Sequence, residues 1–200
     1  MCRILLAVSA CLLAFPACQS REDSNSSVTT NSSTESASDN HADNSTVSAQ
    51  PVIDVQLMSW KEIEAFLQSH KGKVVVADIW STSCIPCMRE LPHLFALQKN
   101  YPEDIVAVSI NIDYIGLPDE TPEQSKAKSL EFLRQHKDAT ITNLVSSTPD
   151  EDVFAAVDIA SIPVVLIYNR EGKLVEKFGL EGNGFTYAED VTPFVKELIP

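Results

Sequence analysis

The 200-residue chain has few basic residues, few aromatic residues and, beyond its N-terminus, no long hydrophobic run. Lys and Arg together number 15 against 28 Asp and Glu, which gives a formal net charge of −13. Binding to nucleic acid needs positive charge gathered opposite the phosphates, so we expect no nucleic-acid partner. A channel or transporter would need further apolar segments of about 20 residues, which are lacking.

Cysteine is also scarce in the part of the chain that can fold. Three of the five cysteines stand at positions 2, 11 and 18, which leaves only Cys84 and Cys87. A structural zinc site needs four ligands, and the sequence offers no second cysteine pair and only scattered histidines, so we expect no metal. A static disulfide stays open as an alternative, although a bridge that closes so small a loop restrains the unfolded chain little.

Residues 1–17 have the layout of a secretory signal peptide, because Arg3 precedes an apolar stretch that is too short to span a bilayer. The segment Phe15-Pro16-Ala17-Cys18 resembles the lipobox of bacterial lipoproteins, apart from Phe15, where leucine is usual. The resemblance implies cleavage before Cys18 and attachment of a lipid to Cys18. Ordinary cleavage nearby, which would give a soluble periplasmic or secreted protein, is the alternative.

The sequence therefore predicts three parts. Residues 18–50 form a tether that follows the lipid-bearing cysteine. Of residues 19–50, 18 are Ser, Thr or Asn and none is Leu, Ile, Phe, Trp, Tyr or Gly, so this segment cannot bury enough apolar surface to fold. Residues 51–200 are long enough for one hydrophobic core.

Residues 51–200 alternate between helical and strand patterns. Helices are predicted after the capping residues Ser59, Thr121 and Thr148, and over 84–100 and the C-terminus. Strands are predicted at 74–80, 105–112, 140–145, 163–168 and 173–178, the last two joined as a hairpin by 169–172. Parallel strand–helix–strand units followed by an antiparallel hairpin predict an α/β fold, with a mixed sheet flanked by helices.

The pair Cys84-Ile85-Pro86-Cys87 stands where a buried strand gives way to a helix. Unpaired N–H groups and the positive end of the helix dipole would favour the thiolate at Cys84. Cys87, one turn further on, would be close enough to attack a mixed disulfide formed at Cys84. Pro86 costs no hydrogen bond in the first turn and stiffens the pair. The spacing thus predicts a reversible two-electron switch.

The run Trp80-Ser81-Thr82-Ser83-Cys84-Ile85-Pro86-Cys87 resembles the active site of thioredoxin-fold proteins, in particular the exported TlpA/ResA-like thiol-disulfide oxidoreductases. The resemblance covers about residues 70–200, and residues 121–135 look like the helical insertion of that branch. It implies that Trp80 packs under the cysteines. It also implies that Ile162-Pro163 carries a cis-proline facing them and offering its backbone to substrate.

The resemblance also assigns Asp78 to the position of a buried thioredoxin aspartate, whose partner lysine is replaced here by Ser109. Without a cation, burial should raise the pKa of Asp78, which could then act as general base for Cys87. A structural role in capping backbone groups is the alternative. ResA-like proteins place a glutamate near the site after the next strand; Ile112-Asp113 is the nearest equivalent, and we assign it no role.

The function expected from the resemblance is an envelope reductase of protein disulfides that needs no cofactor beyond Cys84–Cys87. Its clients would be cysteine-containing proteins such as apocytochrome c, and its electrons would come from a membrane thiol donor. The default expectation is a monomer held at the membrane through Cys18. A disulfide-donating oxidase on the same fold and a binding module with a static bridge are the alternatives.

Overall fold

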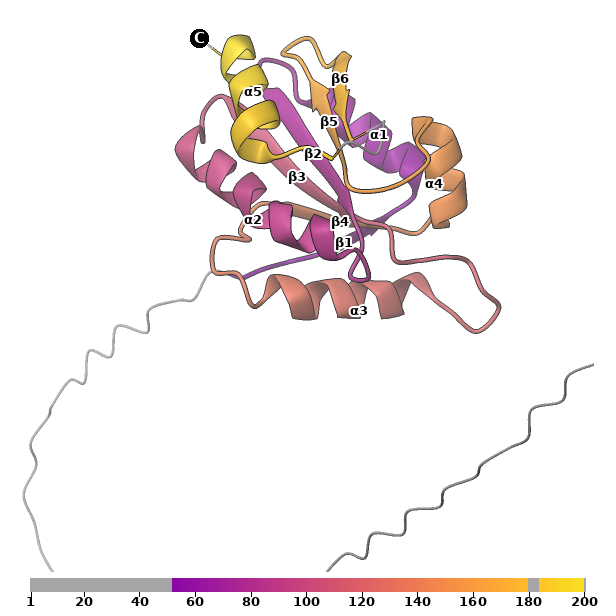
Figure 1. Ribbon diagram of the computed structural model, residues 1–200. Helices are drawn as coiled ribbons and strands as arrows, with labels where there is room; N and C mark the ends of the chain where they lie inside the picture. Colours follow the sequence, from indigo (N-terminus) through magenta and orange to yellow (C-terminus); the bar gives the residue numbers. More distant parts are fainter. Residues whose placement is uncertain (1–51, 180–183, 200) are drawn as a thin grey trace, which may run out of the picture. The chain divides into compact units, whose positions relative to one another are not determined.

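The computed structural model describes residues 52–179 and 184–199. The predicted signal peptide, tether and lipidated Cys18 lie outside these residues. The described part is built around one six-stranded mixed sheet flanked by helices (Figure 1). Within this part of the chain, we find no helix with the length and apolar character needed to cross a membrane.

The strands lie in the order β1-β4-β3-β2-β5-β6. β1, β4, β3 and β2 are parallel, while β5 is antiparallel to β2 and forms a hairpin with β6. This arrangement confirms the predicted α/β architecture with a C-terminal hairpin. The strand bounds are β1 Gln56–Met58, β2 Val74–Trp80, β3 Ile105–Asn111, β4 Thr142–Ser146, β5 Val164–Tyr168 and β6 Leu174–Phe178.

Helices cover both faces of the sheet (Figure 1). One face packs against α2, α5 and the π-helical turn η1 that precedes α5, and the other against α1 and α4. The helix predicted over 121–135 is present as α3 and lies beside β1 and β4. The bounds are α1 Trp60–Ser69, α2 Ile85–Asn100, α3 Pro122–Leu133, α4 Asp150–Val157, η1 Tyr187–Val191 and α5 Thr192–Leu198.

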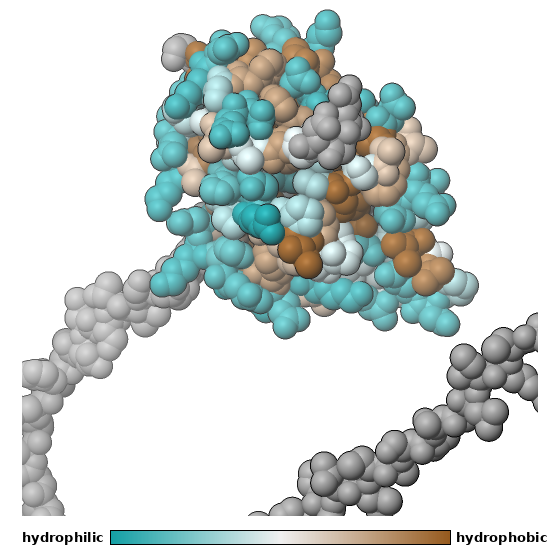
Figure 2. Space-filling model, in the orientation of Figure 1, coloured by the Kyte–Doolittle hydropathy of each residue, from teal (hydrophilic) through white to brown (hydrophobic). Residues whose placement is uncertain are grey.

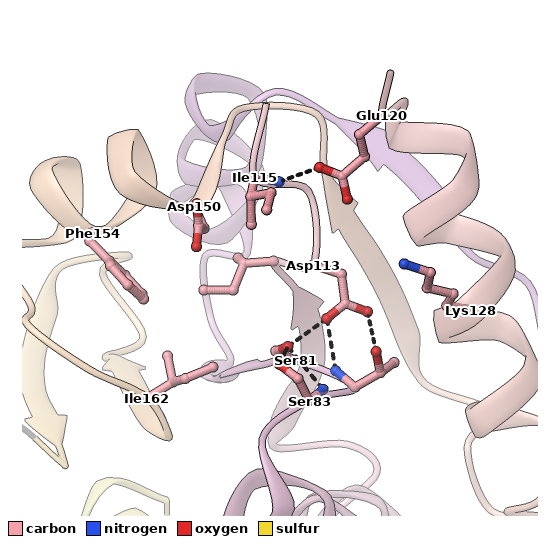
Figure 3. A pocket seen from close by; sticks show the side chains of 11 residues that line it. Ser81, Ser83, Asp113, Ile115, Glu120, Lys128, Asp150, Phe154 and Ile162 are labelled. Atoms are coloured by element: carbon pink, nitrogen blue, oxygen red, sulfur yellow. Dashed lines mark hydrogen bonds between the residues drawn. The ribbon is translucent and has the colours of Figure 1, made fainter. Parts of the chain in front are cut away.

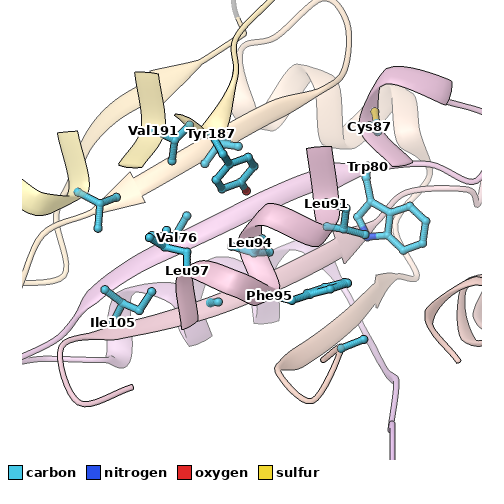
Figure 4. Packing of buried hydrophobic residues seen from close by; sticks show 14 of the residues in the cluster. Val76, Trp80, Cys87, Leu91, Leu94, Phe95, Leu97, Ile105, Tyr187 and Val191 are labelled. Carbon is cyan, nitrogen blue, oxygen red and sulfur yellow. The ribbon is translucent and has the colours of Figure 1, made fainter. Parts of the chain in front are cut away.

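β2 lies inside the sheet, between β3 and β5, and every one of its residues is buried. Successive side chains of a strand point to opposite faces. Val76 and Trp80 therefore join Cys87, Leu91 and the aromatic ring at position 187 in the core under α2 (Figure 4). The intervening residues of β2 face the core under α1 and α4. β2 thus ends, buried on both sides, directly below the cysteine motif.

Two local expectations need correction. The sequence does not predict β1, because the strand has only three residues and no pattern of its own. It is stabilised by pairing with β4, with Leu57 opposite Val145. Thr148 was predicted to cap a helix, but α4 begins after Pro149. The Thr148 hydroxyl instead accepts the backbone N–H of Trp60 at 2.9 Å, which ties the β4–α4 turn to the start of α1.

Candidate active site

Cys84 and Cys87 form a disulfide at the start of α2, with their Cα atoms 5.3 Å apart. Cys84 is the N-cap of the helix, and its Sγ accepts the backbone N–H of Cys87 at 3.2 Å. This places the Cys84 sulfur among the N–H groups of the first helical turn, where negative charge is stabilised. Cys84 is partly exposed while Cys87 is fully buried, so an incoming molecule meets Cys84 first.

The three residues before Cys84 are held by an acidic side chain that follows β3 (Figure 3). Asp113 accepts hydrogen bonds from the Ser81 hydroxyl at 2.5 Å, the Thr82 N–H at 2.8 Å and the Thr82 hydroxyl at 2.7 Å. The Ser81 oxygen in turn accepts the N–H of Ser83 at 3.1 Å. Asp113 therefore fixes the loop that carries Cys84 at its end.

The Ile162–Pro163 peptide bond is cis, as the resemblance implied, and it lies between two pockets. Ile162 lines both of them. One, of about 430 Å³, is bounded by the Ser81–Ser83 loop and by Asp113, Lys128 and Phe154 among others (Figure 3). The other, of about 460 Å³, has Pro86, Glu90, Pro163 and Phe185 in its wall. The structure thus brings the cysteine motif and the proline loop to one surface.

Hydrophobic side chains are exposed on the same domain. Ile85, between the two cysteines, is 68% exposed, and Ile115 and Leu117 in the loop after β3 are 48% and 57% exposed. Figure 2 shows hydrophobic groups gathered in the middle of a face that is otherwise mainly hydrophilic. Ile85 places an exposed aliphatic side chain next to the partly exposed Cys84, and Ile115 adds another to the wall of the pocket that holds Ser81 and Ser83.

Asp78 lies in β2, on the face that carries Val76 and Trp80, and only 1% of it is exposed. Its Oδ2 accepts a hydrogen bond from the hydroxyl of Tyr187, with the two oxygens 2.7 Å apart. Its Oδ1 has no hydrogen-bond partner among the residues that the structure describes. The pKa of Asp78 is raised from 3.8 to about 7: burial is the largest cause, the Tyr187 hydrogen bond opposes it, and the charge of Glu90 adds to it.

The surroundings of Asp78 raise its pKa, which is the direction that the sequence argument predicts, and they add a partner that the sequence does not indicate. Ser109, which stands opposite Asp78 in the sheet, donates its hydroxyl to Asn143 at 2.9 Å. The partner that Asp78 does have, Tyr187, was missed because it stands 109 residues along the chain with no local motif. The sequence marks Asp113 by its position alone and carries no signal for its hydrogen bonds to the loop.

The other predicted site residues lie around this centre. Trp80 is fully buried in the same cluster as Cys87 (Figure 4). Pro86 occupies the first turn of α2. Within residues 52–179 and 184–199, no three His, Cys, Asp or Glu side chains are grouped so as to hold a metal ion.

Comparison with known proteins gives the same picture. No family model matches the chain. The thioredoxin-like protein YneN of Bacillus subtilis is 26% identical over 123 residues, covering 62% of this chain and 66% of YneN. The thiol-disulfide oxidoreductase ResA of the same organism is 29% identical over 119 residues, covering 58% and 57% respectively. The chain thus spans less than two thirds of the length of either relative.

Among solved structures, the exposed lipoprotein thioredoxin Etrx1 of Streptococcus pneumoniae is 25% identical, with a TM-score of 0.51. The match covers 66% of this chain and 90% of Etrx1. The strand order, the disulfide at the start of α2 and the named relatives all point to the thioredoxin fold. The chain has a thioredoxin fold and is similar in sequence to the TlpA/ResA-like proteins.

Proposed function

We propose that the protein is a thiol-disulfide oxidoreductase that reduces disulfide bonds of protein clients in the bacterial cell envelope. The observation that carries this proposal is the Cys84–Cys87 disulfide at the helix start, with Pro86 and Pro163 in the wall of one pocket. The likeness to ResA, whose name is that of a thiol-disulfide oxidoreductase, supports the same reading.

The reaction follows from the positions of the two sulfurs. In the reduced protein, the Cys84 thiolate attacks one sulfur of the client disulfide, and the other client sulfur leaves as a thiolate. Cys87 then loses its proton and attacks Cys84, which releases the second client thiolate and leaves the Cys84–Cys87 disulfide. The client gains two electrons and the protein loses two; the proton of Cys87 passes to one client thiolate, and the other client thiolate stays ionised, as Cys84 was at the start.

Asp78 is the group proposed to take the proton of Cys87. Both residues are buried in the layer between α2 and β2. A carboxylate whose pKa lies near 7 is ionised in part at neutral pH and can both accept and release a proton there.

The client would lie along the two pockets that meet at Ile162. The backbone of Ile162 and Pro163 would pair with an extended peptide, and the exposed Ile85 would pack against its side chains. We further propose apocytochrome c as a client, a membrane thiol protein as electron donor, and attachment to the membrane through Cys18.

A trapping experiment tests the exchange step. The full chain with Cys87→Ser, expressed in its host, should accumulate mixed disulfides between Cys84 and client proteins, because the resolving thiol is missing. Cys84→Ser is the matched control and should trap none. Mass spectrometry of the trapped species identifies the clients. Equal recovery from both variants would contradict the assignment.

The direction of electron flow is tested by the reduction potential of the Cys84–Cys87 pair in glutathione buffers. A value near that of thioredoxin, about −270 mV, supports the reductase. A value near that of the disulfide donor DsbA, about −120 mV, would instead support the oxidase alternative. A bridge that resists dithiothreitol in the native protein would leave only a static disulfide.

A further inference from the structure

The C-terminal segment supplies a polar group to the middle of the sheet. Tyr187 opens the turn η1 and is 1% exposed, and its ring points into the core between Leu91, Leu94 and β2 (Figure 4). Its hydroxyl donates to Asp78 Oδ2 at 2.7 Å. This is a hydrogen bond between two fully buried groups, where the low dielectric strengthens it and makes its loss costly.

Tyr187 is itself held from α2. The carboxylate of Glu90, which lines one of the pockets beside Pro163, accepts the backbone N–H of Tyr187 at 3.2 Å. The rim of the site and the buried carboxylate are thus joined through one residue. Movement of the chain at position 187 would move the hydroxyl that fixes Asp78.

The hydrogen bond leaves the two oxygens of Asp78 unequal. Oδ2 is occupied by the tyrosine, while Oδ1 is buried without a partner among residues 52–179 and 184–199. Burial and the nearby Asp78 charge raise the pKa of Tyr187 well above its ordinary value, so its hydroxyl keeps its proton. A proton that reaches Asp78 is therefore accepted at Oδ1 while Tyr187 continues to donate to Oδ2.

We propose that Tyr187 is a positioning residue that holds Asp78 by one oxygen and directs the other to receive the proton of Cys87. The inference rests on the proposed function, since it assigns the resolving step to the Cys87–Asp78 pair. In that step the Cys87 S–H bond breaks, its proton passes to Asp78 Oδ1, and the sulfur electrons form the bond to Cys84. The bond between Cys84 and the client sulfur breaks at the same time, and its electron pair leaves with the client thiolate. The proton afterwards leaves with the released client thiolate.

Few charged groups face Asp78 and Tyr187. From α2, Glu90 raises the pKa of Asp78, and the exposed His93 ring lies 6.3 Å from the Tyr187 ring. From β3, the facing residue is the neutral Ser109, and from β5 it is Val165. The tyrosine hydroxyl is the group that favours the ionised form of Asp78. Removing it should therefore shift proton binding toward higher pH.

The test compares wild type with Tyr187→Phe, which keeps the ring and deletes the donor. The carboxyl ¹³C signal of Asp78 in the oxidised full-length protein gives its titration midpoint directly. We expect the midpoint to rise by about one pH unit, because a hydrogen bond to a charged group is worth on the order of a tenfold change in ionisation. The pH profile of client reduction should move by the same amount. Tyr168→Phe, on the opposite face of the sheet, is the matched control and should move neither.

A variant without the Asp78 carboxylate shows whether Tyr187 acts by positioning Asp78 or only by packing in the core. In Asp78→Asn the further change Tyr187→Phe should leave the reduction rate unaltered, because the tyrosine acts through Asp78. A rate loss of equal size with and without the carboxylate, or an unmoved Asp78 midpoint, would overturn the proposal. Should Tyr187→Phe fail to fold, 3-fluorotyrosine at position 187 provides a stronger donor and should lower the midpoint. If the wild type does not reduce clients but Tyr187→Phe still shifts the titration midpoint of Asp78, the proposed function is rejected. The positioning of Asp78 by Tyr187 is then supported on its own.

Discussion

Asp78 is an acidic group enclosed by apolar side chains, and this enclosure links its proton to the stability of the fold. Its pKa is about 7 in the folded protein against an ordinary 3.8. The folded state therefore binds the proton more tightly than the unfolded state between about pH 4 and pH 7. Across that window, the free energy of unfolding contributed by Asp78 falls as the pH rises.

Asp78→Asn should remove this pH dependence. At pH 8 the variant is expected to be more stable than wild type by up to about 4 kcal/mol, and at pH 4 the two should be similar. Urea unfolding of the oxidised protein at pH 4, 6 and 8 measures the difference. Asp119→Asn, at an exposed position, is the control and should follow the wild type. An unchanged slope in Asp78→Asn would contradict the assignment of the shifted group.

Asp113 should matter for the loop that presents Cys84. Asp113→Ala removes the acceptor of three hydrogen bonds, and we expect a loss of about 2 kcal/mol in the free energy of unfolding. The freed loop should also change the rate at which iodoacetamide alkylates Cys84 in the reduced protein. Asp119→Ala, further along the loop after β3, should leave both measurements as in wild type.

Residue identities with a local pattern were predictable, and those that depend on distant contacts were not. The two cysteines and Pro86 follow from their spacing in the motif, and Asp78 follows from the resemblance to thioredoxins. Tyr187 has no such signal, because only the packing of the C-terminal segment on β2 brings it to Asp78.

The β5–β6 hairpin meets the cis-proline loop where Gly179 follows β6. Gly179 has φ +98°, and a Cβ built there would lie 2.2 Å from the backbone oxygen of Pro163. The absence of a side chain at Gly179 thus lets the chain pass directly against the loop proposed to hold the client.

Gly179→Ala should therefore displace Pro163. We expect strain of about 1–2 kcal/mol from the backbone conformation, together with a several-fold rise in KM for a protein client from the clash. Gly72→Ala isolates the first effect, because Gly72 has φ +88° and nothing within 4 Å of its Cβ position. Thermal unfolding and client-reduction kinetics would show the two contributions. Equal KM values for the two variants would contradict a role of this contact in binding.

Elements with their own start signals were predicted well. The capping boxes at Ser59 and Thr121 are present with their partners Glu62 and Gln124. β1 escaped prediction because its stability comes from β4, almost 90 positions away, and three residues carry no periodicity. The prediction that Thr148 caps α4 is wrong, because its hydroxyl accepts a hydrogen bond from the Trp60 N–H at the start of α1.

At the scale of the whole molecule, the lipid predicted on Cys18 would hold the domain at a membrane. Cys18→Ser should release the protein from the membrane fraction while the purified variant keeps its reductase activity. Fractionation, with palmitate labelling of the wild type, measures this. Cys11→Ser, within the predicted signal peptide, should leave membrane association unchanged. Retention of Cys18→Ser at the membrane would contradict lipid attachment at this position.

The two tryptophans of the sequence lie in separate cores on opposite faces of the sheet. Trp80 shares its core with Cys87, whereas Trp60, the first residue of α1, lies in the core on the other side. A nearby disulfide quenches indole emission, so the fluorescence of Trp80 should brighten when the bridge is opened while that of Trp60 stays constant. The fluorescence of Trp80 relative to that of Trp60 should therefore report whether the Cys84–Cys87 pair is oxidised or reduced.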